Sequence, residues 1–290
     1  MLVTVKELLR LANAQNKAIG AFNITGLETL QAVLRAAEKM QEPVIIQFAQ
    51  VHEEEGVMDL ATIGPVMVLE AEKATVPVAV HLDHGVDLMF IEKALGMGFT
   101  SVMYDGSSLS YDENIAYTNM AVKLAKSYGA SVEAEVGVMA GLTLNDQKIT
   151  ENRKMDRSMF TDPLIAQDFV EKTGVDCLAC AFGTVHGLYT TKPNLDYDLV
   201  KELDDTIGVP IVMHGGSGVS EADYDIVIEN GVRKVNYYTY MAKSGGEAVS
   251  DYIKNHEGPL YFHDISAIGI QAMQKNVEEA IRIFRHRRDK

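Results

Sequence analysis

The sequence of 290 residues predicts an α/β fold built from repeated strand-helix units. Short β-branched runs alternate about eight times with longer segments in which apolar residues recur at helical spacing. Most of these runs are apolar on both faces, which is typical of parallel strands covered by helices. Because eight such units close a (β/α)₈ TIM barrel, we predict one barrel domain over residues 1–290. A doubly wound open sheet is the alternative, but no Gly-x-Gly-x-x-Gly motif follows the first expected strand.

The N-terminal half starts with a helix and continues with four strand-helix pairs. Thr4 and Glu7 have capping-box spacing before an apolar run, so a leading helix is expected. Strands are expected at AIGAFNIT (18–25), PVIIQFAQ (43–50), VPVAVHLDHG (76–85) and SVMYDGS (101–107). Each precedes an expected helix, at residues 26–41, 58–74, 87–98 and 111–129.

The C-terminal half repeats the pattern and ends in C-terminal helices. Strands are expected at SVEAEVG (131–137), DCLACAFG (176–183), PIVMHGG (210–216) and KVNYYT (234–239), and helices at 162–174, 197–208 and 221–231. Prolines that lack an amide hydrogen suit strand starts, as at Pro43, Pro77 and Pro210. Helices should stop at Gly98, Gly129, Gly174, Gly208 and Gly231. The polar stretch 138–161 is interpreted as a mobile active-site loop.

The net charge and the lack of long apolar runs limit the kinds of molecule that this protein is expected to bind. A net charge of −15 argues against binding nucleic acid or an anionic membrane. An anionic substrate must therefore be held by local groups, such as a metal or backbone amides. No apolar run approaches the roughly 18–20 residues that span a bilayer, and no basic segment followed by an apolar stretch opens the chain. A cytoplasmic location is expected.

Two cysteines, Cys177 and Cys180, have the Cys-x-x-Cys spacing of redox and zinc motifs. In a strand they would point to opposite faces, because side chains alternate with period two. We therefore predict two core thiols rather than a redox pair.

Polar side chains stand at nearly every expected strand exit, which is where such barrels carry their functional groups. They are His81, Asp83 and His84, then Asp105, Glu133 and Glu135, then His186, His214, Asn236 and Thr239. A lone His at a strand end is usually a hydrogen-bonded or capping residue, whereas three at one barrel end match a catalytic zinc with an open coordination position. We predict that His84, His186 and His214 bind zinc. Surface or packing roles are expected for His52, His256, His263 and His286.

The stretch HGGSG, residues 214–218, predicts an anion-binding turn. Glycines allow consecutive amides to turn toward an anion, and the Ser217 hydroxyl adds a donor. The turn follows the seventh strand and the segment NYYT of the eighth strand lies beside it, which is the usual phosphate position in these barrels.

Zinc next to a phosphate cradle indicates a Lewis acid acting on a small phosphorylated molecule. A ketose phosphate could bind zinc through its carbonyl and adjacent hydroxyl while a carbon–carbon bond breaks. Asp83 is then the candidate for proton exchange at the hydroxyl of the cleaved carbon. Asp105 and Glu135 could hold a second metal position, hydrogen-bond the ligating histidines, or simply cap the following helices.

These motifs resemble the class II, metal-dependent fructose-bisphosphate and tagatose-bisphosphate aldolases. The resemblance runs in order from AFN near Asn23 through HLDHG, SVMYDGS, EAEVG, AFGTVHGLY and HGGSG to KVNYYT. It implies a (β/α)₈ barrel, normally dimeric or tetrameric, that cleaves a ketose phosphate reversibly to dihydroxyacetone phosphate and an aldehyde.

The resemblance also implies a role for each matching residue. His84, His186 and His214 would bind catalytic zinc, Asp83 would be the acid/base, and Asp105 and Glu135 would match a second metal position. Asn23 would lie near the substrate. A monovalent cation, Na⁺ or K⁺, would assist the dihydroxyacetone phosphate contacts at Gly187, Gly215, Ser217, Asn236 and Thr239.

Three features depart from the family pattern. The loop VMAGLTLNDQKITE has no Glu where the family carries its second proton-transfer group, with Asp146 and Glu151 as weak substitutes. Tyr238 stands where a smaller residue is usual. The segment GPLYFHD lacks the Arg that usually binds a second phosphate. The identity of the aldehyde is therefore left open.

Two other functions stay open from the sequence. The missing loop Glu would allow a noncatalytic phosphosugar-binding or accessory subunit, although a pure binder needs no proton-transfer group at Asp83. A metal-dependent hydrolase would require carboxylates bridging two metals rather than a glycine cradle. A Schiff-base mechanism is disfavoured, because Lys234 begins its expected strand and so should lie at the far end of the barrel.

Overall fold

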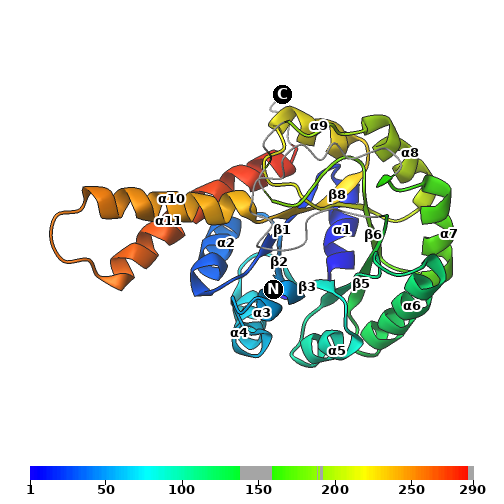
Figure 1. The fold of residues 1–290 in the computed structure, drawn as a ribbon, viewed down its shortest axis with the longest axis horizontal. Coiled ribbons are helices and arrows are strands. Elements are labelled where there is room, and N and C mark those ends of the chain that lie inside the picture. The colour runs from blue at the N-terminus through cyan, green and yellow to red at the C-terminus, as the bar shows by residue number, and fades with distance from the viewer. Residues whose placement is uncertain (138–158, 188, 190–191, 287–290) are drawn as a thin grey trace.

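Eight parallel strands close into a barrel in sequence order, β1 through β8, in the computed structural model (Figure 1). The structure describes residues 1–137, 159–187, 189, 192–286. The strands are β1 (Ile19–Asn23), β2 (Val44–Ala49), β3 (Val78–Gly85), β4 (Ser101–Tyr104), β5 (Ser131–Val136), β6 (Cys177–Cys180), β7 (Ile211–Met213) and β8 (Val232–Tyr237). Since β1 pairs with both β2 and β8, the sheet has no edge, and the open doubly wound alternative is excluded.

Helix α1 precedes β1 and packs on the interior of the barrel, and the other helices follow the strands around its outside. They are α1 (Val5–Ala14), α2 (Leu27–Met40), α3 (Gln50–Glu54), α4 (Leu60–Lys73), α5 (Leu88–Gly96), α6 (Tyr111–Ser127), α7 (Pro163–Thr173), α8 (Tyr197–Ile207), α9 (Glu221–Glu229), α10 (Thr239–Asn255) and α11 (Phe262–Phe284). The Thr4–Glu7 capping box is present. The short helix α3 directly after β2 was not predicted, because five residues carry no helical period.

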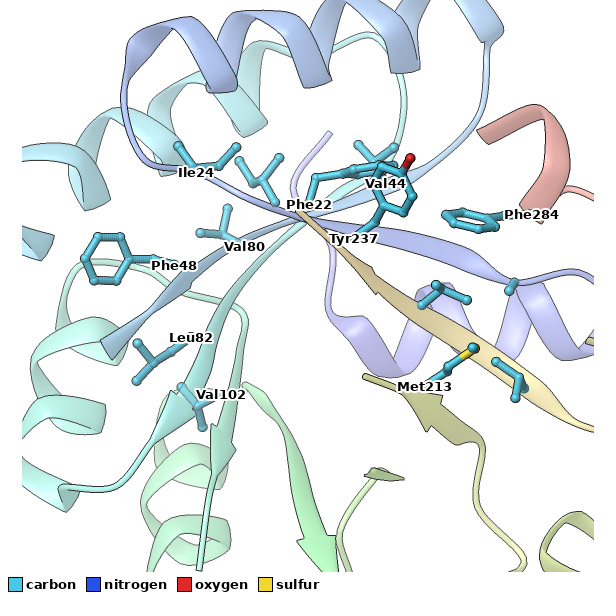
Figure 2. Packing of buried hydrophobic residues seen from close by; sticks show 14 of the residues in the cluster. Phe22, Ile24, Val44, Phe48, Val80, Leu82, Val102, Met213, Tyr237 and Phe284 are labelled. Atoms are coloured by element: carbon cyan, nitrogen blue, oxygen red, sulfur yellow. The ribbon is translucent and has the colours of Figure 1, made fainter. Parts of the chain in front are cut away.

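Apolar residues pack in two separate layers. Side chains inside the barrel, among them Ile19, Ile45 and Met103, pack against the apolar face of α1. A larger cluster fills the space between the strands and the surrounding helices, as Figure 2 shows for Phe22, Val80 and other labelled residues. Two burying surfaces explain why the strands read as nearly continuous apolar runs. The barrel interior is thus a packed core at one end, and it becomes polar toward the carboxyl ends of the strands.

Helices α10 and α11 form an antiparallel pair that extends away from the barrel (Figure 1). Near the barrel, α11 packs on α2 and on α10. At the far end Leu260, Tyr261 and Phe262 are exposed, Phe262 by 78%. These three consecutive apolar residues lie in the connection between α10 and α11 and at the start of α11.

The predicted strand starts at prolines and helix ends at glycines are confirmed. Pro43, Pro77 and Pro210 each directly precede a strand, and the five predicted helix-stop glycines all have positive φ. Both cysteines are free and buried, Cys177 inside the barrel and Cys180 in the outer layer, so they are core thiols that face opposite ways. Within the described residues, no helix is both long enough and apolar enough to cross a membrane.

Candidate metal centre and active site

The end of β3 presents two adjacent side chains to the same side. In a regular strand Asp83 and His84 would point to opposite faces. The pairing of β3 with β4 shifts register between Leu82 and Gly85, and His84 has a φ of +46°. This bulge re-aims His84, so that both its ring and the Asp83 carboxylate lie at the carboxyl end of the barrel.

Three imidazoles converge at this end. The ring of His84 lies 5.3 Å from that of His186 and 4.6 Å from that of His214, and the last two are 5.7 Å apart, measured between ring centroids. One ring nitrogen of each lies within 4.8 Å of the others. His84 Nε2, His186 Nδ1 and His214 Nδ1 are buried and accept or donate no hydrogen bond. Three bare nitrogens at this spacing fit a divalent cation such as zinc.

Neighbouring carboxylates hold two of these rings in place. His84 Nδ1 lies 2.7 Å from Asp105 Oδ2, and the other Asp105 oxygen accepts hydrogen bonds from the Ser107 amide and hydroxyl. His214 Nε2 lies 2.9 Å from Glu133 Oε1. Because a carboxylate only accepts hydrogen bonds, these contacts place a proton on His84 Nδ1 and on His214 Nε2. The opposite nitrogens are thereby left to face each other.

The charge state of His84 couples metal binding to protons. Burial alone would lower the pKa of His84, but the charge of Asp83 and the hydrogen bond and charge of Asp105 outweigh burial and raise it to about 9. A cation bound at Nε2 must therefore displace a proton below that pH.

Amide side chains enclose the Asp83 carboxylate. Asn236 Nδ2 donates to Asp83 Oδ1 at 3.0 Å, while Gln47 Nε2 and Asn23 Nδ2 donate to Oδ2 at 3.0 and 3.4 Å. Burial would raise the pKa of Asp83, but nearby cationic side chains, first among them His84 and including Lys234, outweigh it and hold that pKa well below its usual range. Asp83 is therefore a carboxylate, able to accept a proton.

A second group of possible metal ligands shares His84. It consists of His84, Asp105 and Glu135, all buried, with ligand atoms within 4.8 Å of one another. Glu135 Oε2 also lies 3.8 Å from His214 Nδ1. The two predicted carboxylates thus lie beside the imidazoles rather than at helix caps, which excludes the capping interpretation.

The glycine-rich turn after β7 leaves no room for side chains. A Cβ on Gly215, whose φ is +63°, would lie 2.3 Å from Val185 O, and one on Gly216 would lie 2.6 Å from Val235 Cγ1. Ser217 Oγ accepts a hydrogen bond from the Tyr238 amide at 3.1 Å. Helix α10 begins at the next residue, Thr239, so a helix N-terminus adjoins the turn, as an anion site requires.

The sequence assigned no role in the site to three residues that the structure places around it. Gln47 supports Asp83, Glu133 supports His214, and Lys234 supports Glu133 with 2.7 Å between Nζ and Oε2. A sequence signal was available for two of them. Glu133 is two residues from Glu135, and Lys234 is two residues from Asn236, so each shares a strand face with a predicted site residue. His52 has the packing role that was one of its two expected roles: it is buried, with its ring 5.7 Å from those of Phe48 and Tyr238.

The expected position of Lys234 is wrong. Strand β8 begins at Val232 rather than at Lys234, and the fully buried Lys234 side chain points into the barrel, where Glu133 separates it from His214. The strand extends two residues further toward its N-terminus than its apolar run indicated. Most of the predicted loop 138–161, including Asp146 and Glu151, lies outside the described residues. Its described end is anchored by Thr161, whose hydroxyl donates to Val136 O.

A closed (β/α)₈ barrel with three converging histidines, an encaged carboxylate and a glycine turn at its carboxyl end defines a barrel enzyme with a candidate metal centre. The family model "Fructose-bisphosphate aldolase class-II" matches residues 3–288. The chain belongs to the class II fructose-bisphosphate aldolase family, whose members are lyases.

Relatives agree on the family but not on one substrate. A Bacillus subtilis (strain 168) protein named "Probable fructose-bisphosphate aldolase" is 39% identical over 251 residues, 86% of each chain. A sulfofructosephosphate aldolase from Alkalicoccus urumqiensis is 34% identical over 97% of this chain and 96% of its own. The crystal structure of the YdjI aldolase from Escherichia coli K12 superposes with a TM-score of 0.85 at 34% identity, covering 98% of this chain and 97% of the other.

Proposed function

We propose that this protein is a zinc-dependent aldolase that reversibly cleaves a ketose phosphate to dihydroxyacetone phosphate and an aldehyde. The observation that carries the proposal is the set of three bare, buried imidazole nitrogens beside the Asp83 carboxylate. His84, His186 and His214 would hold the zinc, and Asp105 would orient His84. Bound there, zinc would supply a Lewis acid next to the substrate carbonyl.

Asp83 would transfer the proton at the aldehyde-forming carbon. In the cleavage direction its carboxylate accepts the hydroxyl proton of that carbon, the carbonyl forms, and the carbon–carbon electron pair moves to the dihydroxyacetone phosphate fragment. Gln47 and Asn236 hold the carboxylate for this step through the hydrogen bonds described above. In condensation, the protonated Asp83 returns the same proton.

The phosphate of dihydroxyacetone phosphate would bind at the turn after β7. Gly215 and Ser217 offer close backbone approach and a hydroxyl, and the N-terminus of α10 at Thr239 adds favourable dipoles. Gly187, with φ of +99°, and a monovalent cation, Na⁺ or K⁺, would complete this contact, while Asn23 and Asn236 would lie near the reacting carbons.

The first test separates the mechanisms. EDTA should abolish cleavage and zinc should restore it, whereas borohydride with substrate should leave the enzyme active. Inactivation by borohydride would instead identify a Schiff-base lysine and overturn the proposal. Proton exchange at the dihydroxyacetone phosphate carbon should occur at saturating ligand, and its absence would favour a noncatalytic phosphosugar-binding subunit.

The second test identifies the aldehyde. Relatives named for fructose bisphosphate and for sulfofructose phosphate differ in the group at the far end of the sugar, so phosphorylated, sulfonated and uncharged aldehydes should be compared in the condensation direction. We also propose a cytoplasmic homodimer or homotetramer, and light scattering coupled to gel filtration measures the subunit number.

A further inference from the structure

A buried ion pair lies directly beneath the candidate metal centre. Lys234 on β8 and Glu133 on β5 are both fully buried, with Nζ and Oε2 2.7 Å apart. Two further groups face the same carboxylate: His81 Nε2 at 3.6 Å and Cys177 Sγ at 3.8 Å from Oε2. His81 is itself tied to Ser101 Oγ through Nδ1 at 2.8 Å. Lys234 is therefore the one formal cation that contacts Glu133 in the described residues.

The two oxygens of Glu133 have different partners. Oε2 receives Lys234, whereas Oε1 lies 2.9 Å from His214 Nε2. With Oε2 taken, the carboxylate cannot rotate without breaking the ion pair, so Oε1 stays under the imidazole. A carboxylate has no proton to donate, and His214 must therefore carry its proton on Nε2. This leaves His214 Nδ1 bare, and Nδ1 is the nitrogen directed at His84 and His186.

We infer that Lys234 is a positioning residue for the metal site: it anchors Glu133, which fixes the tautomer and orientation of His214. The inference rests on the proposed function, because it concerns the same metal. It adds a chain of contacts from Lys234 on β8 through Glu133 on β5 to His214 after β7, separate from the contact of Asp105 with His84. Groups of this kind usually change metal affinity by about 10- to 100-fold.

The experiment measures zinc affinity of the metal-free protein by competition with a chromophoric chelator. Lys234→Met, which removes the ammonium at similar length, should weaken zinc binding about 10- to 100-fold. Lys17→Met is the matched control, because Lys17 forms another buried pair with Glu42, 2.6 Å between Nζ and Oε2. Lys17 precedes β1 and Glu42 precedes β2, so this pair lies at the amino ends of the strands, whereas the histidines lie at the carboxyl ends. Lys17→Met should lose stability yet keep wild-type zinc affinity.

A second variant guards against misfolding of the first. Glu133→Gln with Lys234→Met removes both charges of the pair, so neither partner is left as an unpaired buried charge, and the Gln amide can either accept from or donate to His214 Nε2. Long-range ¹H–¹⁵N spectra of the metal-free protein, with the His214 signal identified by its loss in His214→Gln, report the tautomer. We expect the Nε2–H form alone in wild type, a mixture of tautomers in the double variant, and lowered zinc affinity.

The outcomes separate the two proposals. If wild type binds no zinc, the proposed function fails. If wild type binds zinc and both Lys234 variants bind it equally well, or if the double variant keeps a pure Nε2–H tautomer, the positioning role of Lys234 is overturned while the aldolase proposal stands.

Discussion

At the scale of single residues, this site depends on side chains whose surroundings fix their protonation. Nearby cationic side chains keep Asp83 ionised, and three amides orient its carboxylate. His84 and His214 each give one nitrogen to a carboxylate, and the other nitrogen has no hydrogen-bond partner. The neutral amides add hydrogen bonds to Asp83 without adding charge.

Asp83→Asn should lower kcat about 10²- to 10⁴-fold, because an amide cannot accept the hydroxyl proton. Zinc content, measured by atomic emission, should not change, since Asp83 is not among the grouped ligands. Asp87→Asn, at the exposed N-cap of α5, is the control and should have wild-type kcat. A wild-type rate for Asp83→Asn would show that another group transfers the proton.

The stability of the metal-free protein should fall as the pH is lowered from about 6.5 to about 4. Burial lowers the pKa of His52 to about 4, against the opposing charge of Asp83, so in this window the unfolded chain binds a proton at His52 that the folded chain does not. Each such proton contributes about 1.4 kcal/mol per pH unit.

His52→Gln should flatten this pH profile by one proton, measured as the free energy of unfolding in urea at several pH values. A residual slope remains, because burial also lowers the pKa of His81 and of His186 to about 3 and lowers the pKa of His214. His84 adds none below pH 6.5, because its pKa of about 9 keeps it protonated in the folded chain too. An unchanged profile in His52→Gln would contradict the prediction.

At the scale of elements, the ends of strands and the turns after them carry the residues of the candidate site. The bulge at the end of β3 supplies two adjacent groups, while the turn after β7 supplies backbone at two glycines, Gly215 and Gly216, where no side chain would fit. The turn is also pinned from outside, because Tyr189 Oη donates to Gly215 O at 2.9 Å. Its shape therefore exists before a phosphate binds, which lowers the cost of binding.

Gly215→Ala tests this element. The new Cβ would lie 2.3 Å from a backbone oxygen at a φ of +63°, so the turn must shift, with a loss of about 1–3 kcal/mol in unfolding free energy. The KM for dihydroxyacetone phosphate in condensation should rise. Gly129→Ala is the matched control: its φ is +71°, but no atom lies within 4 Å of the added Cβ. It should share only the backbone strain and leave the KM unchanged.

At the scale of the whole molecule, the candidate ligands come from distant parts of the chain. His84, His186 and His214 follow β3, β6 and β7, so one cation would cross-link three sectors of the barrel. Such a cation binds only the folded chain, and its binding free energy therefore adds to stability.

Zinc at 100 times its dissociation constant should raise the Tm by about 5–10 °C, from about 2.7 kcal/mol of added stability. Differential scanning fluorimetry of the EDTA-treated protein with and without zinc measures the shift. His186→Asn should remove the shift, whereas His263→Asn, on the exposed start of α11, should retain it. An equal shift in both variants would place the zinc elsewhere.

The sequence by itself determined the strand-helix order, the barrel and the identity of the three histidines, since the periodic burial of strands and helices is written in local apolar patterns. It also indicated the glycine turn, because HGGSG follows the seventh expected strand and lies beside the eighth. The exact ends of a strand are not set by its local apolar pattern, however, and β8 begins and ends two residues earlier than predicted.

Only the tertiary structure decided which partner each polar group meets. The bulge that re-aims His84, the amides from β1, β2 and β8 that enclose Asp83, and the Lys234–Glu133 pair under His214 all join residues far apart in sequence. The physical reason is closure: β8 pairs with β1 only when the barrel closes, and closing the barrel brings interior side chains of opposite strands within hydrogen-bonding distance.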